Sequence, residues 1–210
     1  MKKQLAMIAL AALGFLVVSA YSQVTVEPGA VIGIGSFWVT SSGGGESSSS
    51  DSRTGFLAGG VLDIGFSHYL SLEPGIQYSG RGGKSSSDGV NETDEFDYLA
   101  IPINLKVKYP VTPVISPYVL AGINVGFLLG ASSTVTEEGV TTTYSGTSGL
   151  NTLDFGFDLG VGSEFHVGNI IPFVDLGWYI GVANISSDAS SGYSSTNHGF
   201  EVKAGIKFKT

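Results

Sequence analysis

The sequence predicts an all-β fold: an eight-stranded antiparallel up-and-down transmembrane β-barrel, preceded by a cleaved signal peptide. Three observations predict it, namely an N-terminal export signal, eight segments of alternating apolar and polar residues, and connections that alternate between short and long. Glycine accounts for 31 of 210 residues, only 13% of residues are charged, and the mean hydropathy is +0.26. This composition suits neither a disordered chain nor an ordinary soluble domain, so the excess apolar surface needs another environment.

Residues 1–20 have the three parts of a secretory signal peptide. Two lysines follow Met1, an apolar run covers 5–18, and small residues lead up to Ala20. The run is shorter than the roughly 20 residues of a membrane-spanning helix. We expect cleavage after Ala20 or Ser22, which leaves one barrel domain over 21–210. The absence of cysteine excludes disulfides, thiol catalysis and a lipidated cysteine anchor.

Period-two alternation is clearest between Asp154 and Val167. Odd positions such as Phe155 and Phe157 are mostly apolar, whereas even positions such as Asp158 and Glu164 are polar or glycine. A tilted strand of about 9–11 residues crosses a membrane, and this segment is at least that long. The same reading places strands at about 24–39, 54–66, 70–81, 96–109, 117–130, 154–167, 170–184 and 198–209.

The connections between these strands alternate in length. Short ones lie at 67–69, 110–116 and 168–169, and long ones at about 40–53, 82–95, 131–152 and 185–197. A soluble sandwich could imitate the strands, but alternating lengths are typical of outer-membrane barrels with short periplasmic turns and long external loops. We therefore expect the outer membrane of a Gram-negative bacterium, with both termini in the periplasm.

Aromatic residues provide an independent indication, because they gather on the lipid face at both edges of a membrane. Four fall at the turn-side ends of strands and six towards the loop side. The predicted aromatic girdles are Phe66, Tyr109, Phe165 and Phe208 on the turn side, and Trp38, Phe56, Tyr78, Phe127, Phe155 and Phe200 on the loop side.

Three segments resemble the PorT-like outer-membrane β-barrel family: LSLEPGIQYS at 70–79, FDYLAIPINLKVKY at 96–109 and PYVLAGINVGFLL at 117–129. The resemblance implies a small eight-stranded barrel without catalytic residues, and a role in secretion assembly by analogy alone. Pro74 and Pro102 each remove a donor from a strand, for which we expect a bulge or local bend.

The last residues, 203–210, resemble the C-terminal signal that the barrel-assembly machinery reads, and Thr210 stands where that signal has an aromatic residue. We therefore expect this machinery as a partner during insertion, beside the lipid of the outer membrane.

Inward-facing charges dominate the predicted interior of the barrel. An eight-stranded barrel is just wide enough for its own side chains, and charges away from water must pair. We expect a packed structural network rather than an ion or small-solute channel, which stays the alternative. Its residues are Glu27, Asp63, Glu73, Arg81, Lys106, Lys108, Asp154, Asp158, Glu164, Asp175, Glu201, Lys203 and Lys207.

Histidine and serine raise the further alternative of a barrel hydrolase acting on lipid or peptide. His198 lies near Ser194 and Ser195, but serine is so frequent in these loops that proximity means little. His166 is expected to face the lumen near Glu164 as a hydrogen-bonding partner rather than a metal ligand. We predict no catalytic, cofactor or metal site.

The long loops are rich in serine, glycine and acidic residues, and such tracts are typically flexible and solvated. The formal net charge of −8 argues against nucleic acid as a partner. Binding loops on a rigid scaffold are the common location of recognition, so an extracellular ligand would bind there. The favoured hypothesis is a non-enzymatic outer-membrane protein with a structural or surface-interaction role.

Overall fold

The computed structural model describes residues 24–87, 89–187, 192 and 194–210, so the predicted signal peptide lies outside the described residues. The described part is all-β, and no helix in it is long and apolar enough to cross a membrane. Its strands are β1 (Thr25–Gly43), β2 (Glu46–Ser49), β3 (Asp51–Gly65), β4 (Leu70–Ser87), β5 (Val90–Lys108), β6 (Ile115–Glu137), β7 (Val140–Ser145), β8 (Leu153–Phe165), β9 (Ile170–Gly181) and β10 (Ser194–Phe208).

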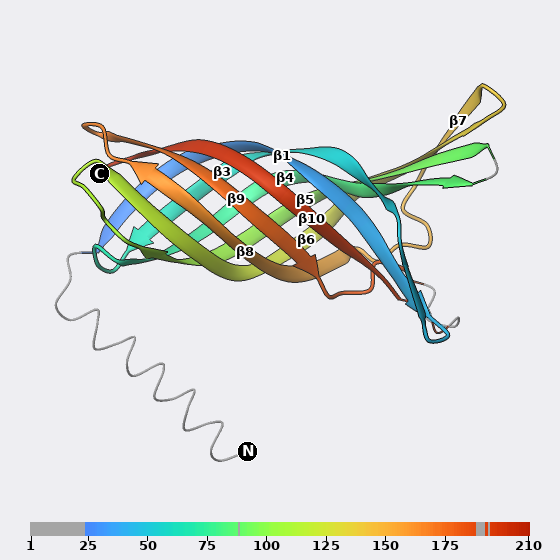
Figure 1. Cartoon of the computed structure of the whole chain (residues 1–210), viewed down its shortest axis with the longest axis horizontal. Helices are drawn as coiled ribbons and strands as arrows, with labels where there is room; N and C mark the ends of the chain where they lie inside the picture. Colours follow the sequence, from blue (N-terminus) through green and yellow to red (C-terminus); the bar gives the residue numbers. More distant parts are fainter. Residues whose placement is uncertain (1–23, 88, 188–191, 193) are drawn as a thin grey trace, which may run out of the picture.

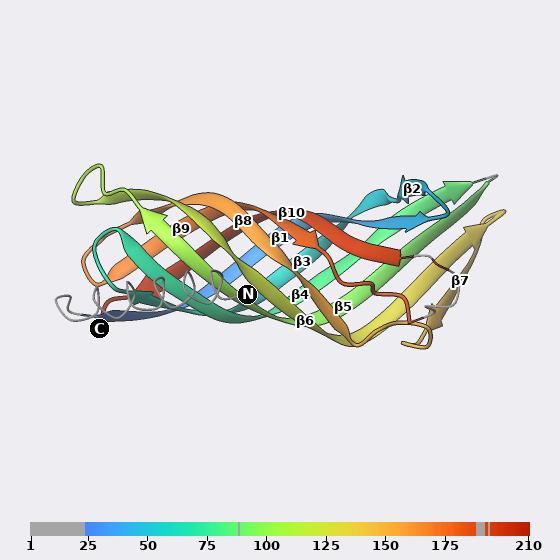
Figure 2. The ribbon, with the colours of Figure 1, turned by 90° about the horizontal axis from the view of Figure 1, so that it is seen from below.

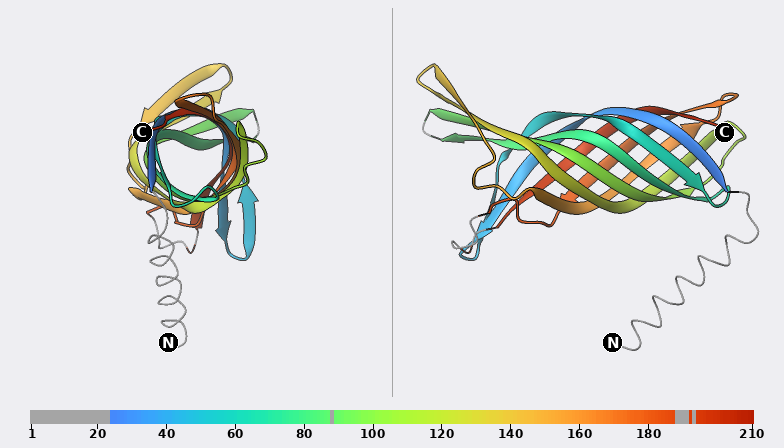
Figure 3. Two further views of the ribbon diagram at one scale, coloured as in Figure 1. Left: turned by 90° about the vertical axis from the view of Figure 1, so that its left-hand side faces the viewer. Right: turned by 180° about the vertical axis from the view of Figure 1, so that it is seen from behind.

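Eight of these strands form an antiparallel ring (Figure 1). The order is β1, β3, β4, β5, β6, β8, β9 and β10, and β10 pairs back onto β1 from Gly29↔Lys207 to Ser42↔Ser194. Seen along the long axis, the tilted strands enclose a round section (Figure 3, left). The predicted eight-stranded up-and-down barrel is confirmed, and β2 and β7 are short additional strands outside the ring.

The strands form where side chains alternate between the ring's interior and its outer surface. In β1, Ile32 and Ile34 are more than half exposed on the outside, whereas Val31 and Phe37 are buried inside. The Phe37 ring fills the space that Gly199 leaves, since a Cβ there would overlap its Cδ1 and Cε1. Glycine on the inner face therefore lets large interior side chains lie flat against the neighbouring strand.

The turn-side ends of the strands agree with the sequence prediction to within about two residues, but the loop-side ends, except that of β8, do not. β4, β5 and β6 continue well beyond the predicted limits, and β2 and β7 form inside segments expected to be loops. The long connections were predicted to be loops, and this was wrong for much of 40–53, 82–95 and 131–145, whereas their flexibility stays a prediction. They are paired hairpins that project from one end of the barrel (Figures 1 and 2).

Two prolines sit in barrel strands without changing their register. The register of β4 and β5 is the same on both sides of Pro74 and Pro102, so neither proline introduces a bulge, and a local bend there stays a prediction. The irregularities lie instead between Ser52 and Leu57 and between Asp97 and Tyr98. A Cβ on Gly75 would lie 3.2 Å from the Pro102 ring, so this glycine gives the ring its room.

Candidate functional site

The interior of the barrel is the first candidate site, because most of the chain's buried charges lie there. Glu27 and Lys108 are half-buried at the turn end. The other predicted lumen residues are at most 8% exposed: Asp63, Glu73, Arg81, Lys106, Asp154, Asp158, Glu164, Asp175, Glu201, Lys203 and Lys207.

Arg81 lies at the centre of the layer nearest the loops. Its Nη1 is 2.8 Å from Asp154 Oδ2, and its guanidinium carbon lies 3.9 Å from the Tyr179 ring centroid and 5.0 Å from that of Tyr98. Asn197 Nδ2 donates to the same Asp154 oxygen at 2.9 Å. Because Arg81 is fully buried, its charge is compensated by Asp154 and by the two ring faces.

Above this layer, the loop-side mouth is covered by an apolar cluster. Ile185, from the connection after β9, packs with Phe96, Tyr98 and Leu128, and each of these side chains is buried. Leu150 packs against the same cluster from the connection before β8. Side chains from two connections therefore pack onto the loop-side end of the interior.

A second layer surrounds Lys106. Its Nζ is 2.6 Å from Glu73 Oε2 and lies 4.4 Å from the centroid of the Tyr118 ring and 5.2 Å from that of Phe173. The Tyr118 hydroxyl donates a hydrogen bond to Asp175. The second layer thus repeats the pattern of the first, with a cation paired to one carboxylate and flanked by aromatic rings.

Nearest the turns, two lysines share two carboxylates. Lys207 Nζ is 2.5 Å from Glu164 Oε1 and also pairs with Asp63. Lys108 Nζ lies 2.9 Å from Asp63 Oδ2 and 3.0 Å from Glu164 Oε2. Glu27 is more distant, at 3.8 Å from Lys207. The four central groups form a closed ion-pair cluster across the barrel.

Carboxylates outnumber cations in this interior, with eight of the thirteen predicted residues acidic. Lys203 pairs with Glu201 at 3.0 Å. Asp158 instead accepts hydrogen bonds from Asn124 Nδ2 at 3.0 and 3.3 Å. Neutral donors therefore satisfy carboxylates for which no cation lies close enough, as buried acids require.

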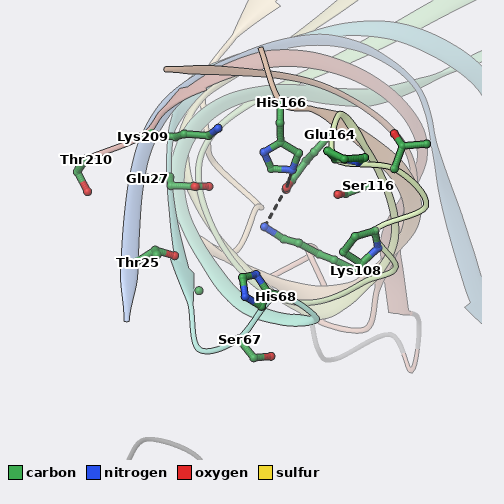
Figure 4. Close-up of a pocket in the computed structure, with 14 residues that line it drawn as sticks. Thr25, Glu27, Ser67, His68, Lys108, Ser116, Glu164, His166, Lys209 and Thr210 are labelled. Atoms are coloured by element: carbon green, nitrogen blue, oxygen red, sulfur yellow. Dashed lines mark ion pairs between the residues drawn. The ribbon is translucent and has the colours of Figure 1, made fainter. Parts of the chain in front are cut away.

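Below the ion pairs, a polar vestibule of about 500 Å³ opens at the turn end. Figure 4 shows the Lys108–Glu164 pair between His68 and His166, with Lys209 and Glu27 on the opposite wall. His166 Nε2 is 3.9 Å from Glu164 Oε2, beyond hydrogen-bond distance. Burial lowers the pKa of His166, and the nearby Glu164 opposes this effect. Among the described residues, no group of three or more acidic or histidine side chains could hold a metal ion.

Among the residues that the structure describes, His198 pairs with a threonine and not with a serine. Its Nε2 lies 2.9 Å from Thr196 Oγ1, and its ring stacks on Trp38 at a centroid distance of 6.0 Å. Ser195 Oγ instead shares a hydrogen bond of 2.8 Å with Ser41 Oγ on β1. These contacts therefore make His198 part of the barrel wall near its loop end.

The predicted girdle aromatics lie at outward-facing positions of the ring. On the turn side, Tyr109 and Phe208 are 72% and 48% exposed. On the loop side, Phe56 is 52% exposed and lies well inside β3, because the strands continue beyond the girdle. The predicted set is Trp38, Phe56, Phe66, Tyr78, Tyr109, Phe127, Phe155, Phe165, Phe200 and Phe208.

Sequence reasoning missed the aromatic partners of the lumen cations. Tyr98, Tyr118, Phe173 and Tyr179 are at most 4% exposed and line the interior beside Arg81 and Lys106. The sequence did contain a signal for Tyr98. On β5 it is an even number of residues from the inward-facing Lys106, so both side chains face the interior.

The remaining candidate is the set of projecting hairpins, at the base of which one interaction links β3 to β5 across β4 and another links the neighbouring strands β4 and β5. Arg53 Nη2 is 2.6 Å from Glu95 Oε1, and the Tyr78 hydroxyl donates to Asp97 Oδ1 at 2.5 Å. Further out, the Thr134 and Thr143 hydroxyls are 3.1 Å apart, and those of Thr136 and Thr141 are 3.0 Å apart. Cross-strand hydroxyl pairs of this kind stabilise polar sheets.

The sequence matches the model of the outer membrane protein beta-barrel domain family over residues 14–187. No curated protein matches it. Solved structures that are similar include the attachment invasion locus protein Ail of Yersinia pestis, at 12% identity and a TM-score of 0.40, covering 87% of this chain and 98% of that one. OprG of Pseudomonas aeruginosa has 11% identity, a TM-score of 0.47, and coverages of 90% and 96%. The outer membrane protease OmpT of Escherichia coli has 11% identity, a TM-score of 0.45, and coverages of 89% and 97%.

Proposed function

Because this chain belongs to the outer membrane protein beta-barrel domain family, we propose that it is a non-enzymatic outer-membrane scaffold that holds its projecting hairpins at the cell surface. The observation that carries the proposal is the filled lumen. Arg81, Lys106 and Lys207, the central cations of the three layers, are all fully buried. A barrel filled in this way can anchor a surface structure without passing solutes.

The second support is the contrast between the two ends of the barrel. The turn end has short connections, whereas the other end has hairpins whose side chains are largely exposed. The first residue of β1, Thr25, and the last residue of β10, Phe208, both lie at the turn end, as in barrels whose termini are periplasmic. We therefore place the turn end in the periplasm and the hairpins outside the cell.

The partners follow from this arrangement. Lipid of the outer membrane would contact the exposed apolar outer surface, and the barrel-assembly machinery would insert the chain by reading its C-terminal strand. The PorT-like resemblance and a role in secretion assembly stay predictions.

Single-channel recording in planar bilayers tests the filled lumen. We expect no discrete conductance steps from the folded protein, because the buried cation layers leave no water path. The same preparation, run on gels before and after boiling, should show a shift in migration that verifies insertion of folded barrels. Conductance steps whose size changes when Asp158 is replaced by asparagine or Lys106 by methionine would overturn the scaffold proposal and indicate a channel.

A further inference from the structure

The outermost part of the structure is a four-stranded sheet, which we call the external fin. It consists of 84–87 of β4, 90–95 of β5, 131–137 of β6 and all of β7, and it projects from the loop end of the barrel (Figure 1). β7 pairs with β6 on one side, and no other described strand pairs with it. The fin therefore ends in a strand edge.

The register identifies the backbone groups at this edge. β6 and β7 are joined at Glu138 and Gly139, which both have positive φ, and Glu137 lies opposite Val140. The Gly146 amide donates to the Ala131 carbonyl at 3.0 Å, so even-numbered residues of β7 direct their backbone groups to β6. The N–H and C=O groups of the alternate residues, Thr141, Thr143 and Ser145, consequently point away from the sheet.

This edge has none of the usual protection against strand pairing. Natural edge strands are commonly blocked by lysine, proline, a bulge or very short length. β7 has the sequence VTTTYS, which contains no charge and no proline and favours extended structure. Its Val140 and Tyr144 side chains are 69% and 64% exposed. An unprotected edge on a surface hairpin is a template for another strand.

Two shallow hollows meet at Tyr144, beside the edge. One, of about 330 Å³, is lined by Val135 and Val140 together with Glu137 and Glu138. The other, of about 340 Å³, is lined by Phe96, Ala131 and Leu150 together with Asp94. The first hollow thus combines apolar side chains with two carboxylates, and the second combines them with one. This combination suits a side chain with an aliphatic stem and a cationic head.

We propose that the β7 edge binds an extended basic peptide segment, which adds to the fin as a further strand. Backbone hydrogen bonds to Thr141, Thr143 and Ser145 would provide affinity, and the two hollows would select alternating apolar and basic side chains. A second copy of this chain fits less well, because it presents the same carboxylates and a formal net charge of −8. The inference rests on the proposed surface-interaction function and names its partner class.

Fluorescence anisotropy with the folded full-length protein in detergent tests this inference. The probe is a fluorescein-labelled octapeptide of alternating lysine and valine. The comparison peptides are a glutamate–valine octapeptide and a lysine–valine octapeptide that is N-methylated at alternate residues. We expect saturable binding of the first probe, no binding of the glutamate peptide, and binding of the N-methylated peptide that is about tenfold weaker, because it loses backbone donors.

Two proline variants separate strand addition from charge attraction. Thr143→Pro removes a free-edge amide and the hydroxyl pair with Thr134, and we expect about tenfold weaker binding. Ser47→Pro is the matched control, because Ser47 occupies the equivalent edge position of β2 and its hydroxyl is 3.1 Å from Ser42 Oγ. We expect this control to bind within about twofold of the wild type, since Ser47 lies on β2 and lines neither of the two hollows at Tyr144.

The double variant Glu137→Gln/Asp94→Asn tests the hollows. We expect a loss of about three- to tenfold at 50 mM salt that shrinks at 0.5 M salt, because partly exposed charges are screened. The inference would be overturned if the probe did not bind, or if Thr143→Pro, Ser47→Pro and wild type bound it equally. It would also be overturned if the N-methylated peptide bound as well as the first probe, or if the edge formed dimers of this chain instead of binding peptide. A silent bilayer alongside such a result would leave the scaffold function standing.

Discussion

Replacing Arg81 with methionine removes one partner of a fully buried ion pair in the lumen. Arg81 and Asp154 side chains are both fully buried, and their closest atoms are 2.8 Å apart. Removal leaves the Asp154 carboxylate with Asn197 as its main donor. Because an uncompensated buried charge is costly, we expect the free energy of unfolding to fall by about 3–5 kcal/mol.

A second substitution separates the cost of the unpaired Asp154 carboxylate from the cost of the lost guanidinium contacts. In Arg81→Met/Asp154→Asn the carboxylate becomes a neutral amide, whose oxygen can still accept from Asn197. We expect this double variant to recover at least about 2 kcal/mol of the loss, and the remainder reflects the absent contacts of the guanidinium with Tyr98 and Tyr179. Lys84→Met is the control, since Lys84 is exposed on the same strand and should cost less than about 0.5 kcal/mol.

The assay is urea unfolding of the protein folded into lipid vesicles, followed by tryptophan fluorescence and analysed by linear extrapolation. A cost below about 1 kcal/mol for Arg81→Met would contradict this expectation, because the pair would then be hydrated. A double variant as unstable as the single one would also refute it, since the penalty would then come from packing alone.

Three further outcomes follow from the same structure. Gly199→Ala should destabilise the barrel by about 1–3 kcal/mol through overlap with Phe37, and Phe37→Leu in the same chain should recover part of the loss in urea unfolding. In a Trp38→Phe variant, lipids with brominated acyl chains should quench Trp178, which is half exposed on the outer face; stronger quenching by aqueous iodide would contradict this. Burial lowers the pKa of His166 from its ordinary 6.5, so an NMR titration should give a lower value. The unfolded chain then binds this proton more readily, so the free energy of unfolding should decrease as pH falls below 6.5. A pKa above 6.5 would contradict this expectation.

The barrel strands were predictable because one face meets apolar surroundings and the other does not. That pattern located Asp158 and Glu164 inside and Phe157 outside, and it set the turn ends to within about two residues. The alternation is absent from the projecting hairpins, because both faces of those strands are surrounded by water. The fin strands, such as β7, carry no apolar alternation, so their pairing depends on backbone hydrogen bonds and threonine pairs that leave no periodic signal.

The lumen was predictable in composition but not in pairing. Strand parity gave the set of inward charges, whereas the choice of partner depends on register and on distance across the ring. Lys207, for example, meets Glu164, which is 43 positions away. The rings beside Arg81 required the same three-dimensional information. Pairings of this kind are set by closure of the barrel and not by local sequence.

The filled lumen and the placement of the hairpins both depend on closure of the ring between β1 and β10, where Ile32 lies opposite Ala204. Because the chain lacks cysteine, Ile32→Cys/Ala204→Cys can be oxidised without competing thiols. We predict an intramolecular disulfide in the folded protein, detected as faster migration of the boiled, unreduced chain, and no such bond in Ile32→Cys/Ile123→Cys. Free thiols or only intermolecular bonds in the seam variant would contradict a closed barrel.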